Sequence, residues 1–150
     1  MEGTLSQEIK KGVTGKRGIS FAFILVSAIL AAVMLIVYSK TGISTFTPTL
    51  SGKVRTLLGV CIVLGAILSI FELKNGKYVL YLLLLWTWLE FLLYEASYIS
   101  NVMVGIDGNS FSAGFILTAL SGLFACLSAL VSAITQKKEF GSQKPDAEEK

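Results

Sequence analysis

Residues 19–38 read ISFAFILVSAILAAVMLIVY, an unbroken stretch without a charged side chain or a proline. An α-helix rises about 1.5 Å per residue, so this stretch can cross the hydrocarbon of a membrane, which is about 30 Å thick. Buried strands are much shorter than this. We therefore predict a transmembrane helix, retained rather than cleaved as a signal peptide because no small-residue cleavage site follows it.

Three further apolar stretches of similar length follow, at residues 54–71, 78–104 and 111–135, and none contains proline. Short connections with turn residues, such as Asn75-Gly76, separate the last three stretches, so consecutive helices should be antiparallel neighbours. The expected fold class is therefore all-α: an integral membrane protein built as an antiparallel bundle of four transmembrane helices over residues 19–135.

The composition agrees with this fold class. Hydrophobic residues make up 53% of the chain, charged residues make up 15%, and the mean hydropathy is +0.70. A soluble domain has about 25% charged residues, so the surface of this chain must face lipid. The charge gathers at the ends, where residues 1–18 form a polar segment and residues 136–150 are expected to be a disordered tail.

The basic residues predict how the helices cross the membrane, because cytoplasmic loops carry an excess of Lys and Arg. With both termini in the cytoplasm, the basic residues near the spans on the inner side are Lys10, Lys11, Lys16, Arg17, Lys74, Lys77, Lys137, Lys138 and Lys144. Those left on the outer side are Lys40, Lys53 and Arg55. We therefore expect both termini to be cytoplasmic in a multi-pass plasma membrane protein, and the lack of cysteine pairs and glycosylation sequons favours a bacterial source.

The sequence lacks the residues that several classes of function require. The chain has no His, and its two cysteines, Cys61 and Cys126, lie in separate apolar stretches. We expect no metal site, no redox pair and no cofactor. The net charge of +3 comes mostly from residues beside the spans, so it indicates topology and not nucleic-acid binding.

The third apolar stretch contains two carboxylates, Glu90 and Glu95. Counted from Tyr78, Glu90 lies about 18 Å along the helix and within the hydrocarbon. A stripe at helical spacing is formed by Thr87, Glu90, Tyr94, Ser97 and Asn101. Because polar groups avoid lipid, we predict that this stripe faces inward as a candidate intramembrane site. Whether Glu90 serves function or only packing stays open. Glu95 is nearer the outer surface and is expected to pair with Arg55 in a salt bridge.

Small residues at every third or fourth position let helices approach closely in lipid. The predicted helix-packing residues are Gly65, Ser69, Gly114, Thr118, Gly122 and Ala125. Such rows also line pores and oligomer interfaces, although packing within one chain is their commoner use.

The pattern as a whole favours a small non-catalytic protein with four transmembrane helices that binds other membrane components. It would be an accessory or regulatory subunit of a transporter or secretion assembly, or an immunity protein against a membrane-active toxin. The expected partners are the lipid bilayer and another membrane protein or a second copy of the chain. The alternative is a small proton- or ion-coupled transporter or channel that uses Glu90.

Overall fold

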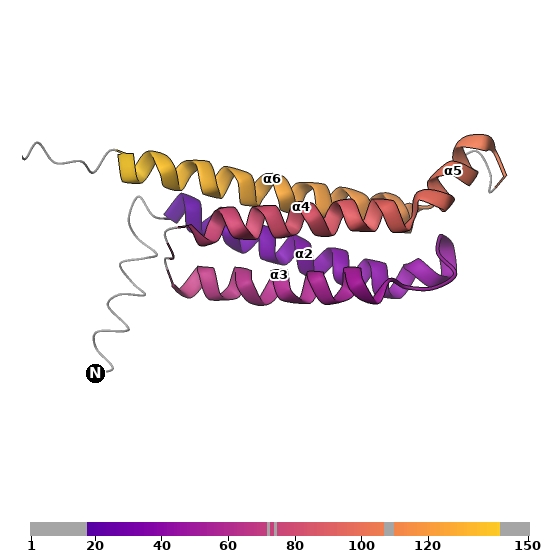
Figure 1. The fold of residues 1–150 in the computed structure, drawn as a ribbon, viewed down its shortest axis with the longest axis horizontal. Helices are drawn as coiled ribbons and strands as arrows, with labels where there is room; N and C mark the ends of the chain where they lie inside the picture. Colours follow the sequence, from indigo (N-terminus) through magenta and orange to yellow (C-terminus); the bar gives the residue numbers. More distant parts are fainter. Residues whose placement is uncertain (1–17, 72, 74, 107–109, 142–150) are drawn as a thin grey trace, which may run out of the picture.

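The computed structural model describes residues 18–71, 73, 75–106 and 110–141, and the regular structure in these residues is entirely helical. Figure 1 shows the helices in order along the chain. They are α2 (Gly18–Thr45), α3 (Gly52–Ile70), α4 (Gly76–Tyr94), α5 (Ala96–Val104) and α6 (Ala113–Gly141).

Four of these helices are long and apolar enough to cross a membrane. Their apolar spans are Ile19–Ile43, Gly52–Ile70, Gly76–Tyr94 and Ala113–Thr135. At about 1.5 Å per residue, even the shorter spans approach the thickness of the hydrocarbon. The prediction of an all-α chain with four helices of membrane-spanning length is confirmed, and the fold fits a multi-pass membrane protein.

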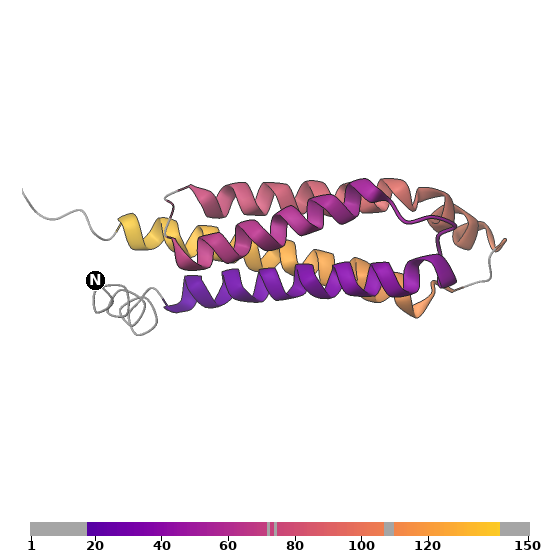
Figure 2. The same cartoon turned by 90° about the horizontal axis from the view of Figure 1, so that it is seen from below.

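The four long helices lie side by side (Figures 1 and 2). Both α2 and α4 pack mainly against α3 and α6, and the contact between α2 and α6 is the most extensive. The beginning of α2 and the end of α6 lie at one end of the molecule, which we call the terminal end. The opposite end, called the loop end, consists of residues 46–51, α5 and residues 110–112.

Along α6 the small residues face inward and the large ones face outward. Ala125, Ala129 and Ala133 are almost completely buried, whereas Phe124 and Leu127 are exposed. A helix in water would show the reverse pattern, because burial of large apolar side chains drives its packing. In lipid, close backbone approach stabilises the contact instead.

Two helices are longer than the sequence predicts. α2 continues past Tyr38 to Thr45, and the hydroxyl of Thr41 donates back to the Val37 carbonyl at 2.7 Å, which places this polar residue within the helix. α6 continues to Gly141, beyond Thr135, where the sequence predicts the end of the fourth helix. Residues 1–17 and 142–150 lie outside the described residues.

The third predicted helix, residues 78–104, is two helices in the structure. α4 ends at Tyr94, α5 begins at Ala96, and α5 runs at an angle to α4 (Figure 1). Glu95 lies between them with φ −91° and ψ 11°, outside the regular helical region. No proline or glycine marks this position, and we attribute the bend to the polar partners of the Glu95 side chain, described below.

Candidate functional site at the loop end

The predicted polar stripe is interrupted by the bend at Glu95. Thr87 is buried, and its hydroxyl donates to the Leu83 carbonyl at 2.7 Å and lies 3.7 Å from the Cys61 sulfur. Tyr94 is 42% exposed, and its hydroxyl lies 2.8 Å from that of Thr49. These residues therefore face different surroundings.

The last two stripe residues, Ser97 and Asn101, lie beyond the bend on α5. Ser97 is exposed and Asn101 is half-buried. Because α5 leaves the direction of α4, the spacing that aligned these residues in the sequence does not align them in space. The structure does not bring the five residues together as one inward face.

Glu90 forms a salt bridge with Lys53, with 2.6 Å between Nζ and Oε1. Glu90 lies about one turn before the end of α4, and Lys53 is the second residue of α3, so the pair lies near the loop end. The Lys53 side chain is 66% exposed and that of Glu90 is 22% exposed. Such an accessible pair contributes about 1 kcal/mol or less to stability.

The structure does not bring Arg55 and Glu95 together. Arg55 is exposed, whereas Glu95 is only 2% exposed, accepts a hydrogen bond from Tyr38 and lies beside the Thr47 side chain. Lys53 and Arg55 are two residues apart on a helix and therefore project in different directions. Lys53 projects toward α4, which leaves Arg55 on another side of α3.

Tyr38 is the centre of a polar network at the loop end that the sequence did not reveal. Its hydroxyl donates to Glu95 Oε1 at 3.4 Å and accepts the backbone N–H of Ser51 at 2.9 Å. Ser51 caps α3, because its side-chain oxygen accepts the N–H of Val54. One buried hydroxyl thus joins α2, the start of α3 and the bend after α4.

Glu95 is the ionisable member of this network. Burial raises the pKa of the Glu95 carboxyl to about 6, and the hydrogen bonds from Thr47 and Tyr38 partly oppose this rise. The bend after Tyr94 turns the carboxyl toward these hydroxyls, which lie on α2 and on the connection that follows it. Without them, the buried carboxyl would have lacked hydrogen-bond donors.

Six aromatic rings pack beside this network. They are Tyr38, Phe46, Phe91, Tyr98, Phe111 and Phe115. Phe46 meets Phe115 edge to face with 5.5 Å between ring centroids, and Tyr38 meets Phe91 in the same way at 5.5 Å. Edge-to-face contacts add to the stability that burial provides. The rings come from α2, α4, α5, α6 and the two connections at this end, so they fix the loop end as one unit.

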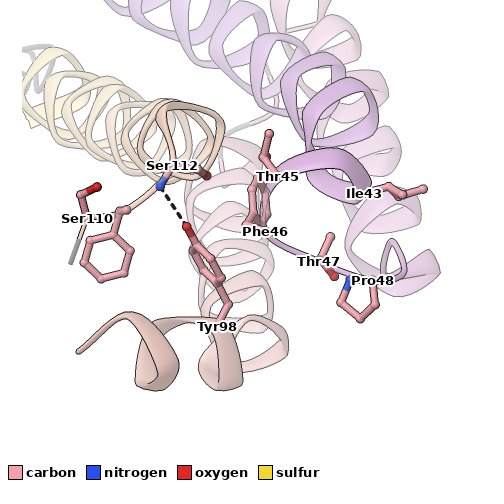
Figure 3. A pocket seen from close by; sticks show the side chains of 9 residues that line it. Ile43, Thr45, Phe46, Thr47, Pro48, Tyr98, Ser110 and Ser112 are labelled. Atoms are coloured by element: carbon pink, nitrogen blue, oxygen red, sulfur yellow. Dashed lines mark hydrogen bonds between the residues drawn. The ribbon is translucent and has the colours of Figure 1, made fainter. Parts of the chain in front are cut away.

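An open pocket of about 540 Å³ lies over this aromatic cluster. Phe46, Thr47 and Pro48 line one side, while Tyr98 and the residues before α6 line the other (Figure 3). The Tyr98 hydroxyl accepts the backbone N–H of Ser112 at 2.9 Å, which ties α5 to the start of α6. Hydroxyl groups and aromatic rings dominate the wall, a composition typical of residues at a membrane surface.

The predicted packing glycines lie at close helix contacts. A methyl group added at Gly122 would lie 2.5 Å from Trp88 Cδ1, and one at Gly65 would lie 3.1 Å from Ala28 Cβ. A methyl group at Gly114 would lie 2.7 Å from the Thr41 hydroxyl oxygen. These glycines permit the approach of neighbouring helices within the chain.

The other predicted packing residues are buried or bonded to their own helices. Thr118 and Ala125 are fully buried, and Thr118 donates to the Gly114 carbonyl. Ser69 donates to the Gly65 carbonyl at 2.8 Å. A hydroxyl that donates to a carbonyl of its own helix needs no hydrogen-bond partner on a neighbouring helix.

The described residues include no group of His, Cys, Asp and Glu side chains that could hold a metal ion. Cys61 and Cys126 are both buried free thiols. Comparison with protein-family models, curated proteins and solved structures finds no match to this chain. The geometry of the loop end therefore carries the functional argument.

Proposed function

We propose that the four spans form an antiparallel transmembrane bundle in the plasma membrane, with both termini in the cytoplasm and the loop end outside. The beginning of α2 and the end of α6 lie at the same end of the molecule, and the excess of Lys and Arg belongs to that side. The loop end then lies at the outer membrane surface.

Cysteine labelling tests this orientation. In a chain with Cys61 and Cys126 replaced by alanine, Ser100→Cys reports on α5 and Asn75→Cys on the connection before α4, and both positions are exposed. An impermeant thiol reagent should label Ser100→Cys in intact cells and Asn75→Cys only after permeabilisation. The opposite pattern would reverse the orientation.

The function that the geometry supports best is non-catalytic binding of another membrane component at the loop end. The observation that carries this proposal is the open pocket at that end, which lies over the aromatic cluster. In the proposed orientation the pocket lies where the spans Ile19–Ile43 and Ala113–Thr135 reach the membrane surface. Binding sites are commonly concave and preformed in this way.

The surroundings of Glu90 favour this proposal over a transporter. A carrier of protons or ions needs its carboxylate on a route across the membrane. Glu90 instead lies near one end of α4, paired with Lys53. Deeper in the helices, buried hydroxyls such as Ser27, Thr118 and Ser121 donate to carbonyls of their own helices.

Site-specific photo-crosslinking in native membranes tests the proposed binding. A photoreactive residue at Ser110, in the pocket wall, should give a discrete adduct, and one at Ile134, exposed at the far end of α6, should give only diffuse lipid products. Equal products at both positions would contradict a binding site at the loop end. Proton or cation flux in liposomes that disappears in Glu90→Gln would instead support the transporter.

A further inference from the structure

We propose that the loop-end pocket binds a neutral, polyhydroxylated ligand, a saccharide ring presented at the membrane surface. This inference rests on the proposed function and names the chemical class of the ligand. The ring could belong to the head group of a glycolipid or to a free sugar, since both present the same hydroxyls and the same C–H faces.

The charge of the wall argues for a neutral ligand. The described residues that line the pocket include no Lys, Arg, Asp or Glu. An anion such as a phosphate is usually held by basic side chains or by several converging N–H groups, and a metal cation is usually held by carboxylates.

The hydroxyls of the wall retain the capacity to bind such a ligand. The Tyr98 oxygen accepts from Ser112 N–H, and the Ser112 hydroxyl oxygen accepts from Phe115 N–H. Both oxygens act as acceptors, which leaves each hydroxyl proton able to donate. Ser110 makes no hydrogen bond to another described residue. These three groups can exchange hydrogen bonds in both directions, as sugar hydroxyls require.

Two aromatic rings complete the match. Tyr98 and Phe111 line the pocket, with 6.2 Å between their ring centroids, and both are partly exposed. The face of an aromatic ring is negative, so it attracts the weakly positive C–H face of a sugar ring. A volume of about 540 Å³ lies within the usual range for small-molecule sites.

The wall is also fixed in advance. Phe46 contacts Phe91, Tyr98 and Phe115, and the Tyr98 hydroxyl is tied to the start of α6. Because the aromatic part of the wall is already packed in place, ordering it on binding costs little additional conformational entropy.

The full-length protein, purified in a detergent without a sugar head group, is placed in phosphatidylcholine nanodiscs for the test. One arm adds monoglucosyldiacylglycerol to the disc, a second adds free methyl glucoside, and a third adds phosphatidylglycerol. Binding is measured by titration with hydrogen exchange, followed at the amides of Phe46, Thr47, Thr49, Leu50 and Ser112. We expect protection by at least one glucose probe and none from phosphatidylglycerol. Which glucose probe binds then identifies the source of the ring.

Variants locate the binding. Ser110→Ala removes one hydrogen-bonding group from the wall and should weaken glucose binding about 3- to 10-fold. Ser110→Trp should abolish binding by filling the pocket. Ser100→Ala removes an equally exposed hydroxyl of α5 that does not line the pocket and should change nothing. Circular dichroism and the unfolding midpoint confirm that each variant is folded.

Three outcomes would overturn the inference: no protection by either glucose probe, protection by phosphatidylglycerol instead, or binding that Ser110→Ala and Ser110→Trp leave unchanged. If the Ser110 photo-crosslink persists in these cases, the loop end still binds a component of another class, and only the saccharide is refuted. Loss of both the crosslink and the protection would refute the proposed function as well.

Discussion

The two ends of the molecule both bury an ionisable side chain among hydroxyls, but they differ in what surrounds it. At the terminal end, Lys77 Nζ lies 2.6 Å from the Ser20 hydroxyl, and Ser132 on α6 donates to the Ser20 carbonyl at 2.9 Å. At the loop end, Glu95 is held by Tyr38 and Thr47 beside six aromatic rings and an open pocket. The contacts at the terminal end join α2, α4 and α6, whereas the loop end also contains a pocket that is open to the surface.

Burial of an ionisable group in a membrane protein does not by itself mark a binding site. Lys77 and Glu95 are almost equally inaccessible, at 7% and 2% exposed. Glu95 adjoins the loop-end pocket through Thr47, which lies beside the carboxyl and also lines the pocket wall.

The largest effect should come from the middle of α6, where a change would loosen both ends together. Gly122→Leu forces a side chain against Trp88, whose indole N–H donates to the Ala119 carbonyl at 3.0 Å. Overpacking of this kind should lower the free energy of unfolding in detergent by about 3 kcal/mol. Gly59→Leu, at a helical glycine with open space around it, is the matched control and should have no destabilising effect. Equal losses in both variants would refute the packing role of Gly122.

The next largest effect should come from the buried hydroxyls. Loss of the Tyr38 hydroxyl at the loop end should lower the free energy of unfolding more than loss of the Ser20 hydroxyl at the terminal end. Tyr38→Phe leaves both Ser51 N–H and the Glu95 carboxyl without this partner, and we expect a loss of about 2–3 kcal/mol. Ser20→Ala keeps its backbone carbonyl as acceptor for Ser132 but removes the hydroxyl that accepts from Lys77, and it should cost about 1–2 kcal/mol. Thermal unfolding of the two variants in one detergent measures the difference. A reversed order would break the comparison.

Glu95 should make stability depend on pH. Its pKa in the fold is raised to about 6, so the folded state holds the proton more tightly than the unfolded chain does. The resulting stabilisation is fully present below about pH 4.5 and is lost as the pH rises through about 6. The change is about 2 kcal/mol, from a pKa rise of about 1.5. Glu95→Gln should remove it, whereas Glu90→Gln should not. An identical pH profile for Glu95→Gln and the unaltered chain would contradict this assignment.

The smallest effect concerns the ion pair between Lys53 and Glu90. A double-mutant cycle with Lys53→Gln and Glu90→Gln should give a coupling of about 1 kcal/mol or less, weakened further by salt. Coupling between Arg55→Gln and Glu95→Gln should be absent, because the structure keeps these residues apart. A clear Arg55–Glu95 coupling would show that the loop end is arranged differently.

Hydropathy predicted the four long helices because transfer into lipid depends on composition and length alone. It did not predict the bend at Glu95, because the cause lies in Tyr38 and Thr47, which are distant in the sequence and become neighbours only in the fold. The same limit explains why Lys53, and not Arg55, meets a carboxylate. That choice depends on how α3 is rotated about its own axis, which packing against α2 and α4 determines.

The pocket was not predictable for a related reason. Its walls come from the residues that connect the spans, where Thr, Ser and Phe carry no periodic pattern. A cue was nevertheless present: the connection after Tyr38 is rich in hydroxyls, and a tyrosine at the end of a span commonly lies at the membrane surface.

If the protein binds its partner through the loop-end pocket and not through Glu90, substitutions at the two places should have different effects on binding. The yield of the photo-crosslinked adduct measures this difference, with the photoreactive residue placed at Pro48 in the pocket wall. It is compared in native membranes for the parent chain, Ser110→Trp and Glu90→Gln. We expect Ser110→Trp to abolish the adduct and Glu90→Gln to leave it unchanged. An adduct that survives Ser110→Trp and disappears in Glu90→Gln would contradict binding through the loop-end pocket.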